Sequence, residues 1–168
     1  MASSAISLTK QWIQQFIIKE SICPFASVPF AKDQITYSLS TDKSFPESIQ
    51  EVIGICMQMR SDPTINTAFY IMENDSYYFE DLLELNLACT EVLVDTDLDS
   101  DFQLVSFHPD FLFGGYLEDD PIHNTNRSPY PMLHILREDE VSRAVDSYGD
   151  TSNILQNNKV TTQRLFGK

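Results

Sequence analysis

The sequence predicts an α/β or α+β fold: a single domain over residues 1–168 in which a mixed sheet of about four strands is flanked by helices, one of them N-terminal. The chain has 168 residues, a length that buries enough apolar surface for one core. Hydrophobic residues make up 42% of the chain, which is typical of globular proteins. Segments with helical periodicity alternate with strand-like segments along most of the chain.

The first helix is predicted from Ala5 to about Glu20, because apolar side chains recur there at the spacing of one helix face. Pro24 is expected to end this helix, since the residue before a proline is disfavoured in helical conformation. Cys23 is therefore expected on a loop. Residues 34–40 alternate apolar and polar side chains, which predicts a strand with one buried face.

The next helix is predicted to begin after Ser44, which forms a capping-box pattern with Glu47, and to continue to about Arg60. Residues 67–72 form an unbroken apolar run, as expected for a strand covered on both faces. Residues 77–94 predict a third helix. Its end is poorly defined, because the tail E-V-L-V is rich in β-branched residues.

Residues 102–108 predict a third strand, and a long acidic loop follows it as far as Arg127. M-L-H-I-L-R at 132–137 predicts a fourth strand after Pro131, and a helix follows it. Residues 150–168 are polar and are predicted to form a tail that is partly helical. Early strands joined through helices are expected to run parallel, but the strand order is not predicted.

The charge of the chain limits its partners. The formal net charge is -14 and the sequence pI is about 4.3, which argues against nucleic acid and against an anionic membrane surface. No Lys or Arg lies between Arg60 and Arg127. Positive charge returns at Arg127, Arg137 and Arg143. Of these, Arg127 and Arg137 are candidates for holding a small anionic ligand.

The cysteines and the N-terminus predict a cytoplasmic protein. Cys23, Cys56 and Cys89 are an odd and widely spaced set without a Cys-x-x-Cys pair, which suggests a reducing compartment. The N-terminus lacks a basic leader with an apolar core, and no apolar stretch approaches the roughly 18 residues of a membrane span.

Two histidines are candidates for acid–base chemistry. His108 ends the third predicted strand, at the edge where open α/β sheets place ligands, and the equally weighted alternative is a histidine bonded to backbone. In a strand, His134 and Arg137 point to opposite faces, whereas in a helix they would share a face. The strand is favoured, because the helical stripe is clean only from Val141.

Cys23 is a candidate nucleophile or metal ligand if an imidazole lies near it. A partly buried, inert thiol is favoured instead, because the negative end of the preceding helix disfavours a thiolate. Arg127 lies in a turn and could hold a carboxylate or phosphate, or form a structural ion pair with Glu118, Asp119 or Asp120. His123 could join those acidic residues at a metal, although its spacing is weak evidence.

Three motifs carry a resemblance to a known family: I-C-P-F-A at 22–26, F-Q-L-V-S-F-H-P at 102–109 and N-R-S-P-Y-P-M-L-H-I-L-R-E at 126–138. In their order and spacing they resemble the bacterial domain-of-unknown-function family 1415, over nearly the whole chain. The resemblance implies a single-domain bacterial cytosolic protein without an assigned activity or cofactor. Its signature residues are Cys23, Pro24, His108, Pro109, Asn126, Arg127, Ser128, Pro129, Tyr130, Pro131, His134 and Arg137.

The first hypothesis is a small enzyme acting on an anionic molecule, with Cys23, His108 and His134 meeting in one pocket as catalytic groups. The ligand-binding residues would be Asn126, Arg127, Ser128, Tyr130 and Arg137. The second hypothesis is a non-catalytic domain that binds a ligand or a partner. The third is a divalent-metal site built from cysteine and histidine. The reaction and the oligomeric state are not predicted.

Overall fold

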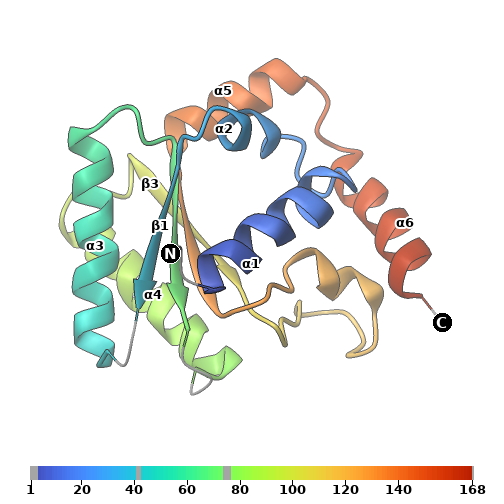
Figure 1. Cartoon of the computed structure of the whole chain (residues 1–168), viewed down its shortest axis with the longest axis horizontal. Helices are drawn as coiled ribbons and strands as arrows, with labels where there is room; N and C mark the ends of the chain where they lie inside the picture. Colours follow the sequence, from blue (N-terminus) through green and yellow to red (C-terminus); the bar gives the residue numbers. More distant parts are fainter. Residues whose placement is uncertain (1–3, 41–42, 74–76, 168) are drawn as a thin grey trace.

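The computed structural model describes residues 4–40, 43–73 and 77–167, and it confirms the predicted fold class (Figure 1). The helical segments are α1 (Ser4–Trp12), the π-helical η1 (Ile13–Ile18), α2 (Ser27–Ala31), α3 (Phe45–Ser61), α4 (Phe79–Asp95), the 3-10 helix η2 (Pro121–Thr125), α5 (Glu138–Tyr148) and α6 (Ile154–Phe166). The strands are β1 (Ile35–Ser40), β2 (Thr67–Met72), β3 (Phe102–Phe107) and β4 (Met132–Arg137). None of the helices in the described residues is long and apolar enough to span a membrane.

The elements with strong local signals lie where the sequence predicts them. The strands β2 and β4 occupy the predicted strands at 67–72 and 132–137, and Ser44 caps α3 through the predicted capping box with Glu47. The sequence did not predict α2 or η2, which are too short to show helical periodicity. The tail is partly helical, as predicted, and its helix is α6. The extent of α6 was hard to predict, because only Thr162 of this helix is fully buried and its apolar stripe is therefore weak.

The strand order is β1-β2-β4-β3. The pair β1 and β2 is parallel, as expected for a crossover through α3, while β4 runs antiparallel to both β2 and β3. Because β4 is inserted between β2 and β3, His134 lies opposite Phe69 of β2 and Val105 of β3. These three side chains therefore share one face of the sheet.

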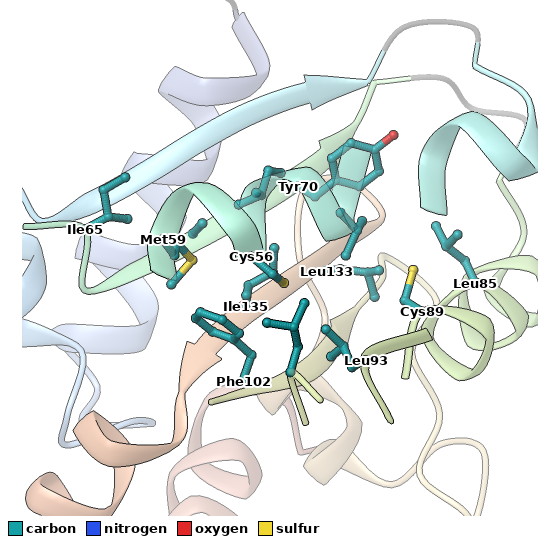
Figure 2. Packing of buried hydrophobic residues seen from close by; sticks show 14 of the residues in the cluster. Cys56, Met59, Ile65, Tyr70, Leu85, Cys89, Leu93, Phe102, Leu133 and Ile135 are labelled. Atoms are coloured by element: carbon teal, nitrogen blue, oxygen red, sulfur yellow. The ribbon is translucent and has the colours of Figure 1, made fainter. Parts of the chain in front are cut away.

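The other face of the sheet carries the larger core. Side chains of α3 and α4 pack there against Tyr70, Leu133 and Ile135, and Figure 2 shows Cys56 and Cys89 among them. Burial raises the pKa of both thiols to about 12, so both cysteines are neutral core residues.

The face that carries His134 is covered less completely. A smaller core forms where Ala5 and Ile13 of the N-terminal helix contact Phe69, Ile71 and Met132. In Figure 1, α1 crosses in front of the sheet, with α5 above it and α6 at the right. The side chains of these segments leave a large cavity above the sheet.

Candidate functional site

A cavity of about 960 Å³ lies between this face of the sheet, the N-terminal segment, α5 and the beginning of α6. We call it the α5 cavity. Most of its lining is aromatic or aliphatic, with Trp12 and Ile13 from the N-terminal helix, Phe69 and Phe107 from the sheet, and Val141 from α5. Small-molecule sites are commonly hollows of this size with apolar walls and a few polar groups.

The helix α5 contributes an apolar face that is not packed against a core. Its first turn carries Glu138, Asp139 and Glu140, which interact favourably with the positive end of the helix dipole. None of its eleven side chains, all of them described, is fully buried. Val141 and Ala144 instead line the cavity. An amphipathic helix normally buries its apolar stripe, so this arrangement leaves apolar surface for a ligand to cover.

His134 is a polar group on the sheet wall of the cavity. Its ring stacks on Phe69 at a centroid distance of 4.1 Å and an interplanar angle of 6°. Its Nε2 lies 2.6 Å from Oγ1 of Thr67, and the same hydroxyl donates to the carbonyl of Ile135 at 2.6 Å. A hydroxyl has one proton, so Nε2 of His134 must be the donor to Thr67. This geometry selects the Nε2–H tautomer and leaves Nδ1 as an acceptor.

We expect His134 to remain neutral at physiological pH. Desolvation lowers the pKa of its imidazole from 6.5 to about 3. Between these two values the unfolded chain binds a proton at this residue and the folded chain does not. The neutral imidazole of His134 therefore contributes fully to stability above about pH 6.5. As the pH falls below this value, the free energy of unfolding decreases by up to about 1.4 kcal/mol per pH unit.

Two measurements check this expectation. Nitrogen-15 NMR should show His134 with a protonated Nε2 and a bare Nδ1 that do not titrate between about pH 8 and 5. Denaturation at several pH values should show a smaller loss of stability for His134→Phe than for wild type over the same range. A His134 signal that titrates near its ordinary pKa would contradict the structure.

Cys23 lines the same cavity, from the loop between η1 and α2. Burial raises the pKa of its thiol, although hydrogen bonds from the backbone of Phe25 and Ala26 favour the thiolate. Cys23 is therefore a protonated thiol at neutral pH. The sequence favoured this state for a different reason, the dipole of the preceding helix.

His108 does not reach the cavity, so the expected convergence of Cys23, His108 and His134 is wrong in this respect. The N–H of Asp110 donates to Nδ1 of His108 at 3.0 Å, and Nε2 lies 3.0 Å from the carbonyl of Tyr77. The ring also contacts Phe79 of α4. The physical reason is strand parity: His108 continues the face of β3 that packs on α4, whereas Val105 and Phe107 line the cavity.

His123 is fully buried and stabilises the long loop. The N–H of Phe113 donates to its Nδ1 at 2.9 Å, and Nε2 therefore donates to the carbonyl of Leu117 at 2.7 Å. Both ring nitrogens thus have protein partners. The described residues contain no group of three or more His, Cys, Asp or Glu side chains that could hold a metal. No set of ligands for the hypothetical metal site is therefore found in this part of the chain.

Arg137 binds the C-terminal end of α3. Its guanidinium donates to the carbonyl groups of Met59, Asp62 and Ile65, at 2.9 Å for the latter two, and lies over the ring of Phe102. It points to the face opposite His134, as strand parity predicted. Although Arg137 also lines the cavity, the hydrogen bonds of its guanidinium go to the protein.

The N-R-S-P-Y-P segment forms the turn between the loop and β4. Asn126 donates to the carbonyl of Ser106 at 3.2 Å and lines the cavity. Ser128 donates to the carbonyl of Tyr130 at 2.6 Å, and the Tyr130 ring packs against the smaller core. Arg127 donates to the carbonyl of Phe111 at 3.3 Å.

The acidic residues of the long loop do not pair with this arginine. Arg127 forms no salt bridge with any residue in the described part of the chain. The predicted ion pair with Glu118, Asp119 or Asp120 is therefore not formed.

Sequence reasoning missed most of the walls of the α5 cavity. Thr67, Phe69, Phe107 and Val141 belong to predicted strands or to the predicted helix after Glu138. Their periodicity identified which side chains are apolar, but it cannot show which apolar surface stays uncovered in the fold.

Comparison with known proteins gives one result. Neither the curated proteins nor the solved structures contain a match. The family described as "Protein of unknown function (DUF1415)" matches residues 4–167. Because this match spans nearly the whole sequence, the chain belongs to the DUF1415 family.

Proposed function

We propose that this protein binds a small, largely apolar molecule in the α5 cavity. The observation that carries the proposal is the cavity of about 960 Å³ beneath the unpacked apolar face of α5. A ligand there would cover Val141 and Ala144 on one side and Phe69 and Phe107 on the other. Removing this apolar surface from water supplies the driving force for binding.

This proposal differs from the expectation of an anionic ligand. Among the described residues that line the cavity, the basic side chains are Arg137 and Arg143. The first donates to carbonyl groups, and the second pairs with Asp139 and Glu140 at 2.6 and 2.8 Å. Glu140 itself lines the cavity and would repel an anion. The cavity therefore favours an uncharged body over a carboxylate or phosphate.

An enzyme that uses Cys23 is the second candidate, because the thiol lines the same cavity and receives backbone hydrogen bonds. The raised pKa of the thiol weakens this candidate, since the thiolate is the nucleophilic form. Binding without covalent chemistry requires only the shape and polarity of the cavity. We therefore rank binding above catalysis.

The test uses N-phenyl-1-naphthylamine, an uncharged probe whose fluorescence increases in apolar surroundings. Wild-type protein should bind it saturably with a stoichiometry of one. Cys23→Ser should bind it within about a factor of two of wild type, because the proposal assigns no bond to the sulfur. Fluorescence that rises linearly without saturation would refute the binding function, and loss of binding in Cys23→Ser would favour the thiol-based candidate.

A further inference from the structure

On the sheet wall of the α5 cavity, the imidazole of His134 offers a ligand a hydrogen-bond acceptor and no hydrogen-bond donor. The Nε2–H group of His134 donates to the hydroxyl oxygen of Thr67, because the hydroxyl proton of Thr67 is donated to the carbonyl of Ile135. Nδ1 of His134 then carries only a lone pair. None of the hydrogen bonds within the described part of the chain involves this atom.

This nitrogen is also open to the cavity. The buried side-chain polar atoms without a partner in the described residues belong to Thr9, Trp12, Glu51 and Tyr70, and Nδ1 of His134 is not one of them. The residue lines the cavity and is only half-buried. An unpaired acceptor that is accessible inside an apolar hollow is a recognition point for a ligand.

We propose that the ligand of the α5 cavity is an uncharged molecule with an apolar body and one O–H or N–H group that donates to Nδ1 of His134. This inference rests on the proposed binding function and adds the chemical class of the ligand. The apolar body would pack on Phe69, which stacks on the imidazole, and on Phe107, whose ring lies 6.1 Å from it. Trp12 continues this aromatic wall at 5.2 Å from Phe107.

The same geometry selects against anions. A carboxylate would place its lone pairs against the lone pair of Nδ1, and the low pKa of His134 prevents the ring from gaining a proton to resolve the conflict. A methyl ether would fit the apolar walls but would leave Nδ1 without a donor. An alcohol, a phenol or an aromatic amine satisfies both requirements.

The test compares 4-butylphenol, its methyl ether and 4-butylbenzoate by calorimetry on the full chain. The comparison is the ratio of phenol to ether affinity in wild type divided by the same ratio in His134→Phe, because this quotient cancels the different hydration of the probes. We expect the quotient to be roughly fivefold to tenfold, the effect of one hydrogen bond in a desolvated site. Ser142→Ala, on the exposed face of α5 and outside the cavity lining, should keep the wild-type ratio.

A second readout needs no variant. The nitrogen-15 resonance of Nδ1 in wild-type His134 should shift on addition of the phenol and should stay in place on addition of the ether. Thr67→Val should lower the preference for the phenol, because either ring nitrogen can then carry the proton.

The outcomes separate the two proposals. If phenol and ether bind wild type and His134→Phe with the same ratio, or if the benzoate binds most tightly, the donor inference is wrong while the cavity still binds ligands. If none of the probes, including N-phenyl-1-naphthylamine, binds at all, the binding function itself is wrong.

Discussion

The Ala144→Trp variant is expected to bind N-phenyl-1-naphthylamine roughly a hundredfold more weakly than wild type. Ala144 lines the α5 cavity from the unpacked face of α5. An indole at this position would occupy the space that a ligand needs. Because no side chain of α5, which is described throughout, is fully buried, the larger residue should change the free energy of unfolding by less than about 1 kcal/mol.

A matched control is available on the same helix. Ser142 is exposed and does not line the cavity, so Ser142→Trp introduces the same side chain on the outer face. This variant should bind the probe as wild type does. Equal affinities for Ala144→Trp and Ser142→Trp, measured by fluorescence titration, would mean that the probe binds elsewhere.

Replacing Arg137 with methionine is expected to lower the free energy of unfolding by about 3 kcal/mol. The substitution removes a charged donor from the carbonyl groups of Met59, Asp62 and Ile65, and it removes the cation above Phe102. The carbonyl groups lie at or just beyond the C-terminal end of α3, where a positive charge is favourable. Lysine should not rescue the loss, because one ammonium group cannot reproduce the planar guanidinium fork.

Chemical denaturation measures this effect, and Arg143→Met is its control. Arg143 forms exposed pairs with Asp139 and Glu140, and its loss should cost less than about 1 kcal/mol. Arg137→Met should also keep its affinity for the apolar probe. A variant that is as stable as wild type but no longer binds the probe would return Arg137 to the ligand-binding role that the sequence suggested.

Much of the fold was predictable because its local signals are strong. The segments 67–72 and 132–137 are largely apolar and bounded by loop residues, and they form the two central strands. The insertion of β4 between β2 and β3 was not predictable, since pairing between distant segments leaves no mark in local periodicity.

The candidate site was predictable only in part, for the same reason. The alternation of side chains along a strand predicted that His134 and Arg137 lie on opposite faces of the sheet, and the structure confirms this. Alternation alone cannot say which face of β3 matches which face of β4. The register that pairs Val105 with His134 decides this, and it places His108 on the far side of the sheet.

Methyl NMR during titration with 4-butylphenol tests whether the α5 cavity holds a ligand. We expect chemical-shift changes at Ile13, Leu136 and Val141, which line the cavity, and none at Val52 or Leu93 in the opposite core. Changes confined to Leu83 and Leu87, which line a separate groove beside β3, would contradict this expectation.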